Sequence, residues 1–91
     1  NILIEEFLTG PEISAHAFFD GASYAAMPVA QDHKRVGDND TGPNTGGMGT
    51  YSPVPFATDD ILAQIAELIY DRFLEGCRKE GIEYKGILFP G

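Results

Sequence analysis

A charged block directly ahead of a glycine cluster is the part of the sequence best suited to chemistry. Residues 31–35 read Q-D-H-K-R, and glycines follow at positions 42, 46, 47 and 49. Glycine leaves the backbone uncrowded, so its N–H groups can turn toward anionic oxygens, while Lys34 and Arg35 supply positive charge beside them. The pattern predicts a site that binds a phosphate or a carboxylate.

The glycines match neither familiar nucleotide-binding loop. Gly42 and Gly47 have the spacing that opens a P-loop, but Met48 stands where that motif needs lysine. The dinucleotide fingerprint fails as well, because Gly47 and Gly49 are followed by Ser52 where it needs a third glycine. Taken alone, the glycines therefore leave a flexible surface loop without a ligand as the alternative interpretation.

Carboxylates at the end of the first apolar run form a second candidate. Glu5 and Glu6 stand between the run at positions 2–4 and the apolar pair at positions 7–8. A solvated strand end accounts for this pattern. An adenine slot also accounts for it, with a carboxylate contacting the amino group of the base or the ribose. Glu12 is close enough in sequence to join a ribose contact.

Other reactive side chains point to structural roles. Asp32 and His33 resemble half of an acid-base site, but no serine or cysteine nucleophile stands at a recognisable spacing. Cys77 falls on an apolar helical stripe and His16 on a strand, so both are interpreted as packing residues. No carboxylates form a compact metal-ligand pattern with His or Cys. We expect no metal ligands and no catalysis from this segment alone.

Composition narrows the choice of partner. The 91 residues are 43% hydrophobic, which is typical of one small folded unit. The net charge of -8, from 14 acidic and 6 basic residues, disfavours nucleic acid and anionic membranes but not small phosphorylated ligands. A single cysteine favours a cytoplasmic setting. Because the chain begins and ends beside apolar runs, we expect it to be a piece of a larger protein.

The elements that must hold these residues form an α+β pattern. Their order is β-β-β-loop-α-β: a hinge strand at 1–8, a hairpin at 13–29, a substrate and phosphate loop at 30–55, a helix at 58–80 and a strand at 85–89. Asp20-Gly21 is a hairpin signal, and Thr58 is a helix N-cap followed by two aspartates. We expect the three N-terminal strands to form one antiparallel sheet, with the helix packed on it through Ile61, Ile65 and Ile69.

Three motifs together resemble one enzyme family. They are I-E-E-F-L-T-G-P-E-I-S at 4–14, Q-D-H-K-R at 31–35 and G-P-N-T-G-G-M-G-T-Y-S-P at 42–53. They closely resemble the phosphoribosylamine-glycine ligases, also called glycinamide ribonucleotide synthetases, over essentially the whole chain. The resemblance implies part of an ATP-grasp domain. It also implies an ATP-dependent ligase of purine biosynthesis that joins glycine to phosphoribosylamine through a glycyl phosphate, giving glycinamide ribonucleotide, ADP and phosphate.

The resemblance also implies roles for individual residues. The adenine hinge would be Glu5, Glu6, Phe7 and Leu8. The rest of the ATP site would be Glu12 at the ribose, Arg35 and Asn44. The substrate side would be Asn44, Thr45, Gly46, Gly47, Met48 and Gly49, and the catalytic group would be Arg35, Lys34 and Asp32. The ligands of Mg²⁺ are expected beyond Gly91, so the isolated segment should not turn over.

Two competing hypotheses stay open at this point. One is a non-catalytic ATP-grasp-like module that binds nucleotide and has lost the chemistry. The other is a structural fragment with no ligand of its own. The ligase hypothesis expects ATP, glycine and phosphoribosylamine as partners, no nucleic acid and no membrane, and it is compatible with a parent chain fused to other purine enzymes.

Overall fold

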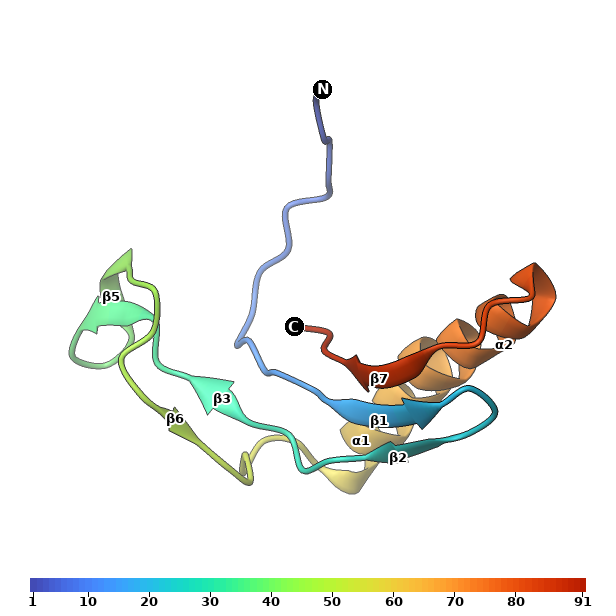
Figure 1. Ribbon diagram of the computed structural model, residues 1–91. Coiled ribbons are helices and arrows are strands. Elements are labelled where there is room, and N and C mark those ends of the chain that lie inside the picture. The colour runs from blue at the N-terminus through green and yellow to red at the C-terminus, as the bar shows by residue number, and fades with distance from the viewer.

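A three-stranded antiparallel sheet forms the centre of the fold. The computed structural model describes all residues, 1–91. The sheet has the order β2-β1-β7, with β1 (Ala17–Asp20) between β2 (Tyr24–Ala26) and β7 (Lys85–Leu88). The helix covers one face of this sheet (Figure 1). The predicted strand at 85–89 and the predicted α+β class are both confirmed.

The hairpin between β1 and β2 is closed by an aspartate. Phe19 pairs with Tyr24, and the Asp20 carboxylate accepts hydrogen bonds from the backbone N–H groups of Ala22 and Ser23 at 2.9 and 2.7 Å. These bonds, led by that from Ala22, hold the pKa of Asp20 below its ordinary value. Gly21 has a φ of 97°, a conformation that glycine adopts at no steric cost. The Asp20-Gly21 hairpin prediction is therefore confirmed.

One long helix follows, and Thr58 caps its first turn by accepting a hydrogen bond from the N–H of Ile61 at 3.4 Å. Its segments are α1 (Asp59–Ile65), the π-helical η1 (Ala66–Asp71) and α2 (Arg72–Glu80). Gly81 ends it in the left-handed conformation, with a φ of 68°. The helix thus runs from Asp59 to Glu80, one residue shorter at its start than the predicted 58–80, and its π-helical segment was not predicted. No helix here is long and apolar enough to cross a membrane.

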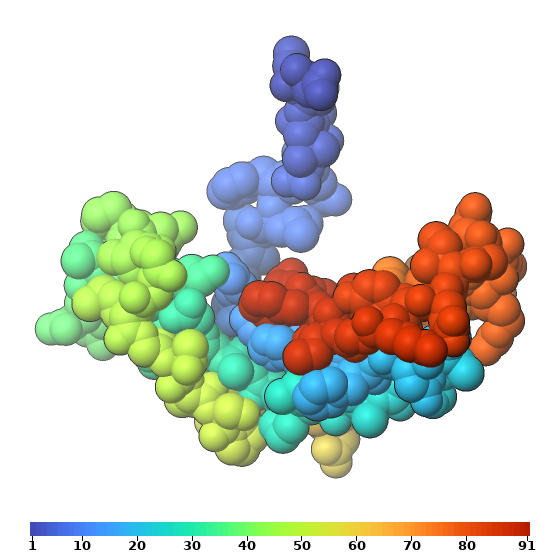
Figure 2. Space-filling view, in the orientation of Figure 1, coloured from blue at the N-terminus to red at the C-terminus, as the bar shows by residue number.

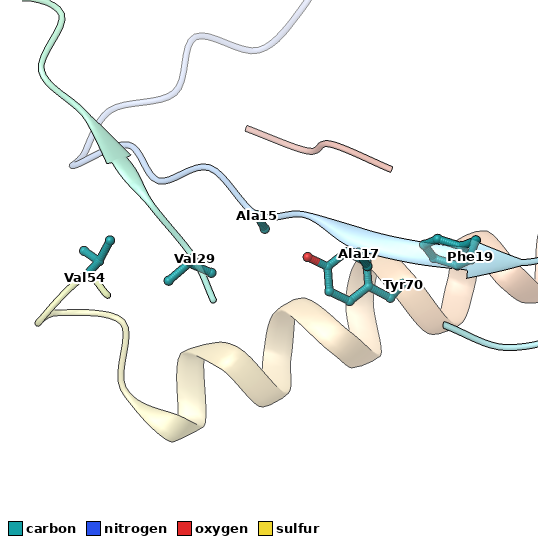
Figure 3. Packing of buried hydrophobic residues seen from close by; sticks show 6 residues of the cluster. All are labelled: Ala15, Ala17, Phe19, Val29, Val54 and Tyr70. Carbon is teal, nitrogen blue, oxygen red and sulfur yellow. The ribbon is translucent and has the colours of Figure 1, made fainter. Parts of the chain in front are cut away.

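The core lies between the sheet and the helix. Its buried members come from both layers and from the chain beside them: Ala15, Ala17, Phe19, Val29, Val54 and Tyr70 (Figure 3). Ile65 and Ile69 are partly buried against this cluster, as predicted. The Phe19 ring packs edge-on against Phe73 and Tyr84, with centroids 5.4 and 5.9 Å apart. Alternate residues of β1 thus face the helix, which fixes the register of the hairpin.

The predicted hinge strand at 1–8 is not formed. Residues 1–9 have no regular secondary structure, and the segment projects away from the sheet (Figures 1 and 2). Its apolar side chains are 77–90% exposed: Ile2, Leu3, Ile4, Phe7 and Leu8. A strand needs a neighbour for its backbone hydrogen bonds, and none of the other residues supplies one. The expectation of three N-terminal strands in one sheet was therefore wrong, since the third strand is β7.

The predicted loop at 30–55 contains two short ladders. One pairs β3 (Gln31–Asp32) with β6 (Thr50–Tyr51), and the other pairs β4 (Arg35–Gly37) with β5 (Thr41–Asn44). They form an arm beside the main sheet (Figure 1). The turn after β4 places both Asn39 and Asp40 at a φ of 57°. Tight hairpins require positive φ at such positions and favour Asn and Asp there, so this turn had a signal in the sequence.

The phenol of Tyr24 links the sheet to the helix. Its hydroxyl donates to Asp71 Oδ1 at 2.6 Å, and this bond, followed by burial, raises the pKa of Tyr24 to about 12 from 10.0. Folding therefore favours the neutral phenol. Its contribution to the free energy of unfolding is complete below pH 10.0 and is lost as the pH rises toward about 12.

We expect the free energy of unfolding to fall more steeply between pH 10.0 and about 12 in the wild type than in Tyr24→Phe. The variant lacks the titrating phenol, so the difference between the two curves isolates this one group. Urea unfolding followed by circular dichroism at several pH values measures both slopes. Parallel curves would show that the bond from Tyr24 to Asp71 does not stabilise the fold.

Candidate functional site

The N-terminal segment meets the arm at a hollow of about 440 Å³. This volume is within the range of small-molecule sites. The residues that line it come from positions 7–12 and from the arm: Phe7, Leu8, Thr9, Gly10, Pro11, Glu12, Gln31, Asp32, Lys34, Arg35, Asp40 and Asn44. Phe7 and Leu8, which are 90% and 77% exposed, thus line the same hollow as both basic side chains of the arm. The hollow unites the predicted catalytic group with most of the predicted ATP site.

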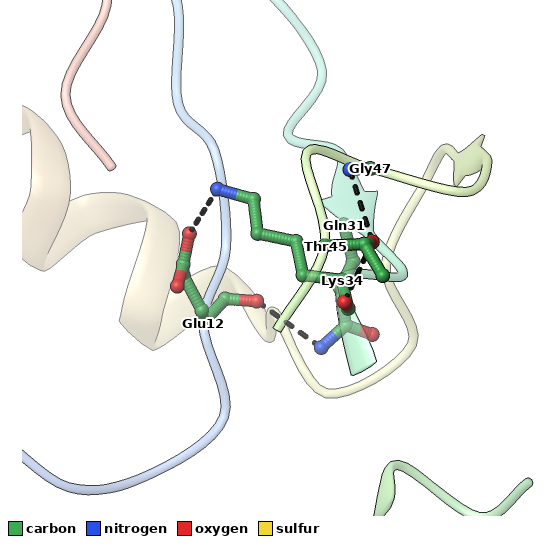
Figure 4. A network of polar contacts seen from close by, with 5 residues as sticks. All are labelled: Glu12, Gln31, Lys34, Thr45 and Gly47. Atoms are coloured by element: carbon green, nitrogen blue, oxygen red, sulfur yellow. Dashed lines mark hydrogen bonds and ion pairs between the residues drawn. The ribbon is translucent and has the colours of Figure 1, made fainter. Parts of the chain in front are cut away.

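Glu12 is held in this hollow by two contacts (Figure 4). Its carboxylate forms an ion pair with Lys34 Nζ at 3.2 Å, and its backbone carbonyl accepts a hydrogen bond from Gln31 Nε2 at 3.1 Å. The Glu12 side chain is 62% exposed and that of Lys34 41%, so water screens the pair and it contributes little to stability. Its effect is to place a carboxylate and an ammonium group together at the rim.

Thr45 holds the glycine-rich turn against the basic pair. Its backbone N–H and its hydroxyl both donate to the carbonyl of Lys34, at 2.5 and 2.7 Å. The same hydroxyl accepts a hydrogen bond from the N–H of Gly47 at 3.2 Å (Figure 4). Further backbone bonds join His33 to Met48 and Gly49, at 2.8 and 2.9 Å. The glycines are therefore folded over residues 33–34.

The Asp32 carboxylate lies directly against this turn. Gly47 has a φ of 128°, and a Cβ at this position would lie 3.0 Å from Asp32 Oδ2 and 3.2 Å from Oδ1. Asp32 Oδ1 is buried and has no hydrogen-bond partner. A buried carboxylate oxygen normally has a donor, so this atom is an acceptor with free capacity beside the hollow. Glycine at position 47 is what allows the close approach.

Arg35 stands between two hollows. Its Nε donates to the carbonyl of Gly42, which ties its guanidinium to β5. It lines the hollow at Glu12 and also a neighbouring one of about 560 Å³, which includes Asp32, His33 and Met48. A guanidinium has five N–H donors, so those not used by Gly42 are available to an anion.

Some predicted site residues are not brought together. Glu5 and Glu6 are exposed on the projecting N-terminal segment and line neither hollow. Of the predicted substrate residues, Asn44 lines the first hollow and Met48 the second, while the remaining four shape the turn instead. The ATP and substrate roles of all these residues stay predictions.

Gln31 and Asp40 line the first hollow and were not predicted as site residues. Gln31 begins the Q-D-H-K-R motif, but its amide acquires a role only through contacts with distant residues. Asp40 is in the turn after β4, and the Asn-Asp pair there was its signal. Both residues therefore depend on the arm being folded into ladders.

Comparisons with known proteins agree with this geometry. A family model described as "Phosphoribosylglycinamide synthetase, ATP-grasp (A) domain" matches residues 1–91. The chain is 52% identical to the trifunctional purine biosynthetic protein adenosine-3 of Gallus gallus, covering 99% of this chain and 9% of that protein. It is 49% identical to a phosphoribosylamine--glycine ligase of Leptospira interrogans, covering 99% of this chain and 21% of that enzyme.

A solved structure gives the same result. The crystal structure of phosphoribosylamine--glycine ligase from Thermotoga maritima superposes with a TM-score of 0.79 at 45% identity, over 93% of this chain and 21% of that one. The chain thus spans about a fifth of these single-enzyme relatives. Its sheet, helix and arm correspond to one piece of their ATP-grasp domain. The chain belongs to the phosphoribosylglycinamide synthetase family.

Proposed function

We propose that this chain is the part of an ATP-dependent phosphoribosylamine-glycine ligase that carries one side of its nucleotide and substrate site. In the reaction, the γ-phosphoryl group of ATP passes to a carboxylate oxygen of glycine, giving glycyl phosphate and ADP. The amine of phosphoribosylamine attacks the glycyl carbon, phosphate leaves, and the nitrogen loses a proton as the amide forms. The product is glycinamide ribonucleotide.

The hollow that joins residues 7–12 to the basic pair carries this proposal. Phe7 and Leu8 provide apolar surface for a base, and Glu12 provides a carboxylate for ribose hydroxyls. Lys34 and Arg35 provide positive charge where the phosphates would lie. Charge that develops during phosphoryl transfer is stabilised by such fixed cations, and this stabilisation is stronger where water is excluded.

The glycine-rich turn suits the protection of glycyl phosphate. A free acyl phosphate would hydrolyse, so the reaction needs a cover that excludes water. Residues 44–49 fold over residues 33–34 through Thr45, and their backbone can approach a substrate closely because three of them are glycines. We assign this turn to the phosphate and amine-substrate side of the site.

Metal binding is assigned to other parts of the ligase. No group of three or more His, Cys, Asp or Glu side chains in this chain could hold a metal ion. We propose that the Mg²⁺ expected with ATP finds its protein ligands in the rest of the ligase. As an enzyme of purine biosynthesis the ligase is proposed to act in the cytoplasm. Fusion to other purine enzymes, as the names of several relatives indicate for those proteins, is part of the same proposal.

The test is the reaction of the complete ligase that carries this segment. Consumption of phosphoribosylamine should require both ATP and glycine and should release ADP and phosphate in equal amounts. Calorimetry with ATP alone measures nucleotide binding separately. Binding of ATP without turnover would favour the non-catalytic module, and absence of both would favour the structural fragment.

A further inference from the structure

Gln31 joins three segments of the chain through one side chain. Its amide nitrogen donates to the backbone carbonyl of Glu12 at 3.1 Å, and its amide oxygen accepts a hydrogen bond from the hydroxyl of Tyr51. If the amide were turned over, the Tyr51 hydroxyl could still accept a hydrogen bond, but the amide oxygen would lie against the Glu12 carbonyl, which can only accept. The contact with the Glu12 carbonyl therefore fixes the orientation of the amide.

Tyr51, the second partner, is itself held in place. Its ring stacks on His33 with centroids 5.2 Å apart, and its backbone pairs with Gln31 across the β3–β6 ladder. Gln31 and Tyr51 are both half-buried. The ladder and the stack together give the Gln31 amide a rigid base from which it reaches the N-terminal segment.

Glu12 has no comparable support of its own. It is exposed and precedes the first strand, and the nearest backbone pairing is the bridge between Ser14 and Ala30 further along the chain. At the hollow itself Glu12 makes two contacts, with the Gln31 amide at its carbonyl and with Lys34 at its carboxylate. The ion pair is exposed and easily exchanged with water, so the hydrogen bond from Gln31 is the better-defined contact.

We infer that Gln31 is a positioning residue for the nucleotide site, acting through Glu12. By holding the carbonyl of Glu12 against the arm, it sets where the Glu12 carboxylate stands relative to Lys34. This inference rests on the proposed function, since it assumes that Glu12 contacts ATP. It adds Gln31 to the nucleotide site. Gln31 does not contact ATP itself but positions Glu12, which does.

The primary test is Gln31→Met in the complete ligase, which keeps the length of the side chain and removes both hydrogen bonds. We expect KM for ATP to rise about tenfold and kcat to change less than about twofold, because ground-state positioning of ATP is lost and the chemical groups stay. Tyr51→Phe removes only the bond to Gln31, and we expect it to raise KM for ATP by about threefold. Tyr84→Phe, which removes a phenol bonded to the Ile87 carbonyl, is the matched control and should leave KM unchanged.

A double-mutant cycle separates positioning from a general structural role. If Gln31 acts through the Glu12 side chain, Gln31→Met should change KM for ATP less than about twofold once Glu12→Ala is present. If the two substitutions instead raise KM for ATP independently, so that the double variant shows the product of the two single effects, the inference is wrong. The proposed function would not be affected by that result. An unchanged KM in Glu12→Ala alone would remove Glu12 from the nucleotide site and the inference with it.

Discussion

Gly47→Ala is expected to lower kcat/KM of the complete ligase by about a hundredfold. Two costs combine at this position. A φ of 128° is one that L side chains rarely adopt, and the new Cβ would lie 3.0 Å from Asp32 Oδ2. Backbone strain of this kind costs about 1 to 3 kcal/mol, and the contact adds to it, so the turn should move away from the basic pair. Initial rates with ATP, glycine and phosphoribosylamine measure the loss.

The neighbouring glycines provide matched controls for this prediction. Gly46 does not have a left-handed φ, and a Cβ there meets nothing within 4 Å, so Gly46→Ala should lower activity far less than Gly47→Ala. Gly49 has a φ of 148° with open space around it, so Gly49→Ala tests backbone strain without the contact. If Gly47→Ala were as active as Gly46→Ala, the close approach to Asp32 would have no functional importance.

Arg35→Ala is expected to lower kcat/KM of the complete ligase by roughly ten- to a hundredfold. Hydrogen bonds to charged groups contribute about 1.5 to 3 kcal/mol, and Arg35 is placed to make one with an anionic ligand between the two hollows. Arg35→Lys should recover part of the loss, because it keeps the charge but not the planar set of donors. Steady-state kinetics with varied ATP give both constants.

Cys77→Ala should have the opposite effect to Arg35→Ala, because it should change stability and not activity. Cys77 is buried on the helix, with 8% of its surface exposed, so this variant should melt at a lower temperature and keep its activity. Full activity in Arg35→Ala would refute the place of this residue in the site. A folded but inactive Cys77→Ala would show that the thiol has a role beyond packing.

Features set by neighbouring residues could be predicted from the sequence. The Asp20-Gly21 hairpin and the Thr58 cap each depend on side chains within three residues of the backbone groups they satisfy. The apolar strand at 2–4 failed because pairing depends on a partner, not on the strand's own composition. The Asn39-Asp40 turn was missed because the surrounding glycines and charges were interpreted as a loop, although the local signal was present.

In the candidate site, too, some residues can be recognised from their neighbours in sequence, whereas others acquire their roles only through distant contacts. Lys34, Arg35 and Asp32 are recognisable because charge close to glycines is a local pattern. The role of Gln31 depends on Tyr51, twenty positions away along the chain, and on the Glu12 carbonyl, nineteen positions away. Neither pairing can be inferred from spacing. The Asp32 contact with Gly47 likewise exists only because the β3–β6 ladder brings the two halves of the arm together.

The π-helical segment in the middle of the helix has a consequence for insertions and deletions. An α-helix turns about 100° per residue, so side chains spaced by four drift around it by about 40° at every step. The wider turn of η1 absorbs part of this drift and keeps Phe73 packed against the same core cluster as Ile65 and Ile69. Because a π-helical turn holds one residue more than an α turn, loss of one residue from 66–71 would restore regular α geometry and leave α2 close to its present rotation. An added residue would instead turn α2 by about 100°, so the middle of the helix should tolerate a one-residue deletion better than a one-residue insertion.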